Sequence, residues 1–434
     1  MRWLFSFPTL AAARGWYDRS NMGKPRQFQH DPVSLDLLKE NQWDVNEVGV
    51  ATAAGLGSNR TDLAPQPDAE ASTYFCDRKW EGFHILQRLD ETGLAWRLFR
   101  DGQNTTSFDI DIASHDPGEF TKIIRQTLKL PALEPYQNEL GIFTLDGNRA
   151  TRVSIRRSDA YTLFVTQNGV WMWPPVRLGF RHDTGYTTSF GKRIFLKTVS
   201  MDPVIFEMGQ FLSEDEAESI VEQAMPHFKQ SPVLKQTTHL GNSHSDFRTS
   251  TQAWIGNAKS SAAAEFDMSV EAITRVPREN NEDLQVLRYM EGQFYHAHSD
   301  WLDISLYPEQ KDVWLNAHYG FADRLATVFA YFTDSPGGHT IFPNIDGRRT
   351  GNFKDCETGY KSLCKKGHVA MWYNLLPTGK GDKAATHGGC PPIDGATKFS
   401  ANKWVRTKPF KGSQKPTWMP SHPRLIAAKL VRTI

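Results

Sequence analysis

Residues 284–300 read LQVLRYMEGQFYHAHSD, and this stretch decides the fold. Its first six residues are mostly apolar or aromatic, a composition typical of a strand. It ends in His298-Ser299-Asp300. On an extended strand the side chains at positions i and i+2 point to the same side. His298 and Asp300 can therefore share one metal ion while Ser299 faces away.

A second histidine completes a candidate metal site. Two histidines and one carboxylate on one face of a metal form the facial triad of non-haem Fe(II) oxygenases, which leaves the remaining positions open. His387 would supply the third ligand from a strand that folds back beside His298 and Asp300. With 14 histidines in the chain such a motif also arises by chance, so on spacing alone an ordinary buried or surface histidine stays open.

Lys398 follows His387 in the sequence and gives the motif a chemical context. A 2-oxo acid with a distal carboxylate needs a cation deep in the same pocket. A lysine on the strand after the distal histidine can supply that cation as a compact point charge. The alternative is a solvated lysine on the surface, where most lysine side chains lie.

Five ordered blocks between about residues 196 and 410 resemble the prolyl 4-hydroxylase family. The blocks are Phe211-Leu212-Ser213, Arg248-Thr249-Ser250, residues 284–300, residues 337–343 (GGHTIFP), and residues 387–404 (HGGCPPIDGATKFSANKW). The resemblance implies a double-stranded β-helix, or jelly roll, with supporting helices packed on one sheet. We therefore expect a mainly β fold with flanking helices (α+β), preceded by a β-rich N-terminal region.

The resemblance also implies roles for the matching residues. His298, Asp300 and His387 would bind Fe(II), and Lys398 would pair with the 5-carboxylate of 2-oxoglutarate. These four residues are the predicted catalytic set. The implied chemistry needs Fe(II), 2-oxoglutarate and O₂, with ascorbate as a further cofactor.

Three more residues are predicted to bind the cosubstrate or to line its pocket. Tyr289 would donate its hydroxyl to the same carboxylate as Lys398, Trp404 would line the pocket near the iron, and Thr327 would border the cosubstrate. For each of them the alternative is an ordinary core residue. Lys398 stands one residue further from His387 than the family spacing, and a shift of one position in the strand would turn its side chain away from the pocket.

The implied reaction is the hydroxylation of a peptidyl residue, with proline to 4-hydroxyproline as the leading reading and with succinate and CO₂ released. It implies a proline-containing peptide or protein as partner. The long segment between Trp301 and Asp323 contains Tyr307, Trp314 and Tyr319, and it either grips such a peptide or is a simple surface insertion. Two alternatives remain: the same chemistry on another side chain or small molecule, and a degenerate oxygenase fold that serves as a binding module.

The composition excludes some functions. Lys and Arg number 50 against 49 Asp and Glu, so no overall field attracts nucleic acid, and none is expected as a partner. No apolar run reaches the roughly 18 residues that a membrane helix needs. Nothing in the sequence indicates the oligomeric state.

The chain divides into four predicted regions. We expect a poorly ordered leader or linker over 1–75, a β-rich accessory domain of unknown role over 76–195, the catalytic domain over 196–410 and a tail over 411–434. Hairpin turns are predicted at Asp101-Gly102, Asp146-Gly147 and Asn168-Gly169, the last two leading into strands around Val153–Ile155 and Val170–Trp173. Helices are predicted from Ser213, where Glu216 completes a capping box, and over Ser261–Arg275. The expected strands of the catalytic domain are 284–289, 325–332, 369–373 and 404–406.

The compartment is predicted only from the N-terminus and from sequons. Arg2, an apolar stretch from Trp3 to Leu10 and three alanines resemble a secretory signal, although an ordinary terminus is the alternative. Sequons at Asn59 and Asn104 are compatible with the endoplasmic reticulum or secretory route, with the cytoplasm as the alternative. The pairing among Cys356, Cys364 and Cys390 does not follow from sequence.

Overall fold

The computed structural model describes residues 73–133, 138–157, 161–232, 247–256, 260–304, 322–348, 352 and 354–409. The expected leader up to residue 72, the tail, and Tyr307, Trp314 and Tyr319 of the aromatic segment lie outside the described residues. All described residues belong to one compact unit, Asn46–Ile434. None of the helices in the described ranges combines the length and the apolar character needed to cross a membrane.

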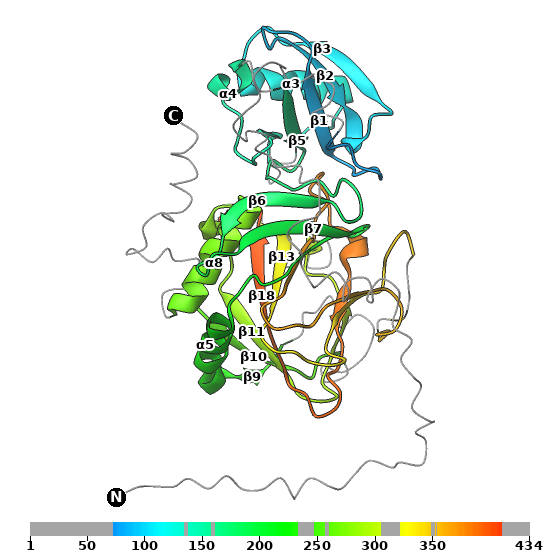
Figure 1. The fold of residues 1–434 in the computed structure, drawn as a ribbon. Helices are drawn as coiled ribbons and strands as arrows, with labels where there is room; N and C mark the ends of the chain where they lie inside the picture. Colours follow the sequence, from blue (N-terminus) through cyan, green and yellow to red (C-terminus); the bar gives the residue numbers. More distant parts are fainter. Residues whose placement is uncertain are drawn as a thin grey trace, which may run out of the picture. The chain divides into compact units, whose positions relative to one another are not determined.

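Two antiparallel sheets build the C-terminal half (Figure 1). The larger sheet has nine strands in the order β6-β7-β8-β16-β13-β18-β11-β10-β9, and the smaller has four in the order β12-β17-β14-β15. The strands of the larger sheet are β6 (Arg181–Thr187), β7 (Arg193–Met201), β8 (Val204–Met208), β9 (Lys229–Gln230), β10 (Thr251–Ile255), β11 (Leu284–Tyr289), β13 (Arg324–Tyr331), β16 (Val369–Tyr373) and β18 (Lys398–Arg406). The strands of the smaller sheet are β12 (Tyr295–His298), β14 (Thr340–Phe342), β15 (Tyr360–Ser362) and β17 (His387–Gly389). The mainly β jelly roll expected from the sequence is confirmed.

Helices α5 (Glu214–Ala224) and α8 (Ser261–Thr274) support one face of the larger sheet (Figure 1). Their apolar side chains, Ile220 and Val270 among them, belong to the same buried core as Ala253, Val286 and Ala401 of the sheet. The predicted capping box is confirmed, since the Ser213 hydroxyl accepts from the Glu216 amide while the Glu216 carboxylate accepts from the Ser213 amide. Short 3₁₀ turns are η2 (Arg100–Gly102), η3 (Met225–His227), η4 (Arg278–Asn280) and η6 (Lys383–Ala385).

Alternation along β18 separates the two faces of the larger sheet. Ala401 and Val405 join the core beneath the helices, while Lys398 and Trp404 lie on the opposite face. Strand β18 lies between β13 and β11, which places Thr327 opposite Trp404 and Tyr289 opposite Lys398. The face away from the helices therefore gathers the four predicted pocket residues of the larger sheet.

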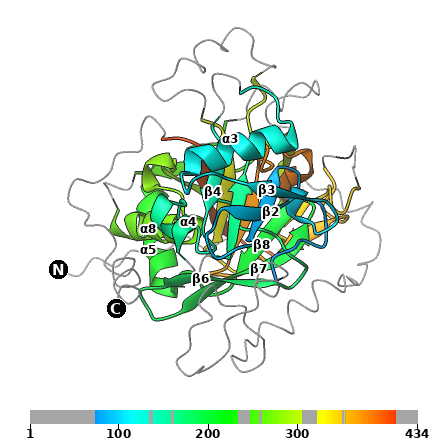
Figure 2. The ribbon, with the colours of Figure 1, turned by 90° about the horizontal axis from the view of Figure 1, so that it is seen from above.

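The N-terminal sheet has five strands in the order β3-β2-β1-β5-β4. They are β1 (Phe83–Arg88), β2 (Ala95–Phe99), β3 (Ser107–Asp111), β4 (Gly141–Phe143) and β5 (Thr162–Thr166). Helix α3 (Pro117–Leu128) lies beside this sheet (Figure 2). It packs Phe120, Ile124 and Leu128 into a core with Trp96 and Leu163 of the sheet. The predicted boundary at 195–196 falls inside β7, so β6 and the first residues of β7 belong to the nine-stranded sheet.

The three predicted turns all form, but two of them do not lead into strands. Asp101 and Gly102 take φ angles of 55° and 74° between β2 and β3, which confirms the first hairpin. The strand predicted at Val153–Ile155 is wrong: these residues lie in helix α4 (Arg152–Arg156), which a Thr151–Ser154 capping box starts. The strand predicted at Val170–Trp173 is also wrong, because Trp171 and Trp173 leave the sheet and enter the core as irregular chain.

Candidate active site

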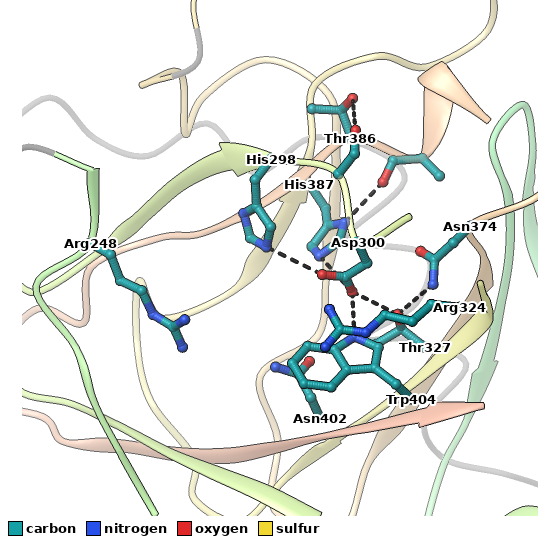
Figure 3. Close-up of polar contacts among 12 residues, drawn as sticks. Arg248, His298, Asp300, Arg324, Thr327, Asn374, Thr386, His387, Asn402 and Trp404 are labelled. Carbon is teal, nitrogen blue, oxygen red and sulfur yellow. Dashed lines mark hydrogen bonds and ion pairs between the residues drawn. The ribbon is translucent and has the colours of Figure 1, made fainter. Parts of the chain in front are cut away.

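The three predicted metal ligands meet between the two sheets (Figure 3). His298 ends β12 and His387 begins β17, and the two residues are directly paired in the smaller sheet. One ligand atom of each histidine and one carboxylate oxygen of Asp300 lie within 4.8 Å of one another. His298 Nε2 is 3.6 Å from Asp300 Oδ1, and His387 Nε2 is 3.5 Å from Asp300 Oδ2.

Hydrogen bonds to the backbone fix how the two imidazoles present their nitrogens. His298 Nδ1 lies 2.8 Å from the His296 carbonyl oxygen, and His387 Nδ1 lies 2.9 Å from the Ala385 carbonyl oxygen. A carbonyl can only accept, so each Nδ1 donates and each Nε2 keeps its lone pair for a metal. Burial, and then the electrostatic influence of the neighbouring His387 imidazole, lower the pKa of His298 to about 3, so His298 is neutral. Two imidazole nitrogens and one carboxylate fit Fe(II).

Asp300 is buried and ionised, with two donors on one oxygen. Burial opposes its ionisation, but His387, His298 and Arg324 outweigh that cost and lower the pKa of Asp300 to about 2. Thr327 Oγ1 donates to Asp300 Oδ2 over 2.7 Å, and Trp404 Nε1 donates to the same oxygen over 2.8 Å. Thr327 and Trp404, which were predicted beside the cosubstrate and the iron, therefore both contact the Asp300 carboxylate.

A buried ion cluster holds the indole of Trp404. The Arg324 guanidinium lies 3.4 Å from the centre of the Trp404 ring. Glu282 accepts from Arg324 Nε over 2.7 Å and from Arg406 Nε over 2.9 Å. Burial of Glu282 is outweighed by these two arginines, so its pKa is lowered and it stays charged. None of the three charged residues was predicted as part of the site, because they come from widely separated segments of the chain.

Lys398 is a buried cation with no hydrogen-bond acceptor among the described residues. Its Nζ lies 5.1, 5.2 and 5.4 Å from the ring centres of Tyr289, Phe329 and Tyr331. Burial lowers its pKa to about 8. An unpaired ammonium in a box of aromatic rings fits the distal carboxylate of 2-oxoglutarate.

The extra residue between His387 and Lys398 does not turn the lysine away. Strand β18 begins at Lys398, after a turn in which Asp394 and Gly395 take positive φ angles of 57° and 75°. Lys398 pairs with Tyr289 of β11 and is completely buried. The turn therefore accommodates the insertion, and the strand keeps its register.

Tyr289 and Thr340 lie in the same pocket as Lys398. A Cβ added at Gly389 would meet the Tyr289 hydroxyl at 3.1 Å, so Tyr289 points from the larger sheet to β17. Gly389 pairs with Thr340 of β14, whose hydroxyl accepts from Tyr331 over 2.8 Å. No role was predicted for Thr340. Its position in the GGHTIFP block is the signal that points to it.

The Tyr295 ring supports His298 and was also missed. The two rings stack with centres 3.6 Å apart and an interplanar angle of 19°. The Arg248 guanidinium lies 4.3 Å from the centre of the Tyr295 ring, and Arg248 is almost fully buried. Tyr295 is three residues before His298 in the quoted stretch, so its position was available from the sequence although its contact was not.

A disulfide bond ties the site to a neighbouring loop. Cys356 pairs with Cys390, which directly follows the strand of His387, whereas Cys364 and Cys76 are free. The pairing left open by the sequence is thus Cys356 with Cys390.

Comparison with known proteins agrees with this arrangement. The family model for the 2OG-Fe(II) oxygenase superfamily matches residues 284–406. The probable prolyl 4-hydroxylase 6 of Arabidopsis thaliana is 30% identical over 231 residues, which cover 52% of this chain and 76% of the relative. The probable prolyl 4-hydroxylase 4 of the same plant is 33% identical over 225 residues, which cover 50% of this chain and 71% of the relative.

Among solved structures, the chain is similar to a viral collagen prolyl hydroxylase from Paramecium bursaria Chlorella virus-1, solved as a 2OG complex. The two are 23% identical with a TM-score of 0.33, and the match covers 46% of this chain and 95% of the viral chain. The family-model match spans all the metal-ligand positions and Lys398 described above. The chain therefore belongs to the prolyl 4-hydroxylase family of 2-oxoglutarate- and Fe(II)-dependent dioxygenases.

Proposed function

We propose that the protein hydroxylates a proline residue of a peptide or protein to 4-hydroxyproline. The observation that carries the proposal is the unpaired Lys398 ammonium in the pocket that also holds His298, Asp300 and His387. One such pocket accounts for both requirements of the reaction, a metal and a dicarboxylate cosubstrate. The family relatives bear the name prolyl 4-hydroxylase, which supports proline as the target.

Each residue has a defined task in this proposal. His298, His387 and Asp300 hold Fe(II), and Lys398 with Tyr289 and Thr340 binds the distal carboxylate of 2-oxoglutarate. When bound, the metal and its cosubstrate supply the oxidising power that turns a C–H bond into C–OH with O₂, while 2-oxoglutarate is converted into succinate and CO₂. The surrounding apolar side chains exclude water from the pocket. We propose ascorbate as the reductant that keeps the iron in the Fe(II) state.

A secretory compartment is part of the proposal. The Cys356–Cys390 disulfide supports it, because disulfides persist in oxidising compartments and are rare in the cytosol. The expected signal-like N-terminus points the same way, and the cytoplasm remains the alternative for the location.

The test is turnover of 2-oxoglutarate by the purified protein with Fe(II) and ascorbate, against a panel of proline-rich peptides. We expect peptide-stimulated succinate and a mass increase of one oxygen on a proline. His387→Ala, which lacks a metal ligand, is the control and should show neither. Succinate without a modified proline would move the target to another side chain or a small molecule. If the wild-type protein binds peptide but neither binds iron nor turns over, the chain is a binding module.

A further inference from the structure

We propose that Asn374 is a positioning residue for the iron site, acting through Thr327 to decide which oxygen of Asp300 faces the metal. The inference rests on the metal site of the family and does not depend on the peptide substrate proposed above. Asn374 directly follows β16, has 1% of its surface exposed, and donates from Nδ2 to Thr327 Oγ1 over 2.9 Å. It contacts no predicted metal ligand itself, and nothing in its local sequence marks it (Figure 3).

The three residues of this chain of bonds come from neighbouring strands. Strand β13 carries Thr327 and lies between β16 and β18 in the larger sheet. Thr327 is opposite Trp404 on one side and Trp372 on the other. The backbone N–H of Asn374 donates to the Leu325 carbonyl. The sheet register thus holds Asn374, Thr327 and Trp404 side by side beneath Asp300.

Hydrogen accounting fixes the direction of each bond. A carboxylate that binds a metal is deprotonated, so Asp300 Oδ2 can only accept, as it does from the donor-only Trp404 Nε1. Thr327 has one hydroxyl hydrogen, and the 2.7 Å contact with Oδ2 requires it. The Thr327 oxygen must then act as an acceptor towards Asn374, and Asn374 must present its NH₂ group. If Asn374 presented its oxygen, it would compete with Asp300 for the single hydrogen of Thr327.

This direction decides how Asp300 can bind a metal. Oδ2 accepts from Thr327 and Trp404, whereas Oδ1 accepts no hydrogen bond from the described residues. Oδ1 is therefore the oxygen left for the metal, and the carboxylate is held as a ligand through one atom. A carboxylate released from these bonds can turn and offer both oxygens. It would then occupy a coordination position that the cosubstrate needs.

The experiment measures Co(II) binding to the metal-free protein by calorimetry, with the visible absorption of bound Co(II) as a second signal. Loss of an outer-shell partner of a metal ligand typically weakens metal binding by about 10- to 100-fold. We expect T327V to fall in that range and to change the Co(II) spectrum. N374A should weaken binding less than T327V, because the Thr327 hydroxyl can still donate to Asp300.

N374D gives the sharpest contrast. Its carboxylate has the shape of the amide but only accepts, so it takes the Thr327 hydrogen away from Asp300, and we expect weaker binding than in N374A. The double variant T327V/N374D has no threonine hydroxyl whose hydrogen the new carboxylate could take, so it measures the effect of the added negative charge alone. It should bind Co(II) no more weakly than T327V. T198V is the matched control, because Thr198 is a buried threonine of the same sheet that donates to the Pro175 carbonyl. It should bind Co(II) like the wild type.

The opposite order would overturn the proposal. The proposal fails if N374A binds Co(II) more weakly than N374D. It also fails if the fold-losses in Co(II) affinity of N374A and T327V multiply in the double variant T327V/N374A. Either result would mean that Asn374 only fills space. Thermal unfolding of every variant is followed in parallel. If N374D does not fold, the comparison of N374A, T327V and their double variant still decides between coupled and independent effects.

Discussion

At the scale of single residues, Lys398 makes the cosubstrate site sensitive to pH. Its pKa is lowered to about 8 because it is buried, and only its charged form can pair with a carboxylate. Below that pH the lysine is charged and ready to bind. Above it, binding must first return a proton to the lysine, so we expect 2-oxoglutarate affinity to fall as pH rises from 8 to 10, by up to about tenfold per unit.

The measurement is calorimetric titration of 2-oxoglutarate into the Mn(II)-loaded protein at several pH values. K398R should keep a charge throughout this range and lose the pH dependence, although its wider head group will bind more weakly. An affinity of the wild type that stays level up to pH 10 would show that Lys398 remains charged in the pocket. The effect of pH on folding has the opposite sign. Between pH 8 and the pKa of about 10.4 in the unfolded chain, Lys398 is protonated in the unfolded state but largely neutral in the folded state without metal and cosubstrate. The free energy of unfolding of that protein therefore rises with pH across this range.

The sequence indicated some site residues and not others for a physical reason. Local alternation predicted that His298 and Asp300 share a face, and they do meet, although β12 ends at His298 and Asp300 lies just beyond it. The facial-triad pattern and the resemblance added His387 and Lys398. Asn374 and Glu282 act through contacts between segments far apart in the chain. Such contacts depend on the register of three strands, which no local pattern specifies.

At the scale of elements, β10 carries an exposed tryptophan beside the iron site. Trp254 is 41% exposed, and its ring centre lies 6.0 Å from that of Trp404. Next to it is a groove of about 390 Å³ that Gln223, His227 and Lys229 also line. An apolar ring at this position suits packing against residues that flank a target proline.

We expect W254A to raise the KM for a proline-rich peptide by about three- to tenfold, the loss of one aromatic contact, while 2-oxoglutarate affinity stays unchanged. Steady-state kinetics with varied peptide measures this. The matched control is F190A, because Phe190 is similarly exposed at 45% but lies in the turn between β6 and β7. Equal KM values for W254A and the wild type would exclude the β10 face from peptide binding.

Local rules predicted some elements well and failed at others. Helix α5 followed from the Ser213–Glu216 capping box, and β11 from its apolar run. Helix α3 was missed although Asp116 caps it and Pro117 occupies its first turn. Val153 and Ile155 were predicted to lie in a strand because two apolar residues at positions i and i+2 would share one face of a strand. In helix α4 they instead point to nearly opposite sides, so that Ile155 is buried while Val153 is 72% exposed. Short segments carry too few residues for periodicity to separate the two.

At the scale of the whole molecule, the Glu282 cluster joins the ends of three strands, β11, β13 and β18, into one buried unit. Removing one charge from a buried ion cluster leaves the others uncompensated, which typically costs about 3 to 5 kcal/mol. We therefore expect E282Q to lower the free energy of unfolding by about 3 kcal/mol. Because the pKa of Glu282 is lowered in the folded state, its stabilisation is present above its unfolded pKa of about 4.3 and is lost as pH falls further.

Urea unfolding of E282Q at pH 7 and at acidic pH checks both statements. The control is E271Q, which removes the charge of a more exposed pair with Arg278 and should cost less than about 1 kcal/mol. If E282Q is as stable as the wild type at pH 7, the two arginines do not depend on Glu282 for their charge balance.

The disulfide acts on the same scale, since it closes a loop over a sequence separation of 34 residues. By chain entropy a loop of that length contributes about 3.8 kcal/mol to stability. We expect the variant C356S/C390S to lose an amount of that order in urea unfolding, and the reduced wild type to behave like it. C364S, which removes a free thiol, serves as the control. A reduced wild type that unfolds at the same urea concentration as the oxidised protein would show that the bond is dispensable for stability.

The separation of the metal ligands along the chain has a consequence for biosynthesis. His298 and Asp300 are synthesised before His387, Lys398 and the supporting Trp404, which emerge from the ribosome only after most of the jelly roll. A growing chain thus holds no complete set of ligands until His387 has been added. We therefore expect the full ligand set to hold iron only after β17 has been synthesised and has paired with β12.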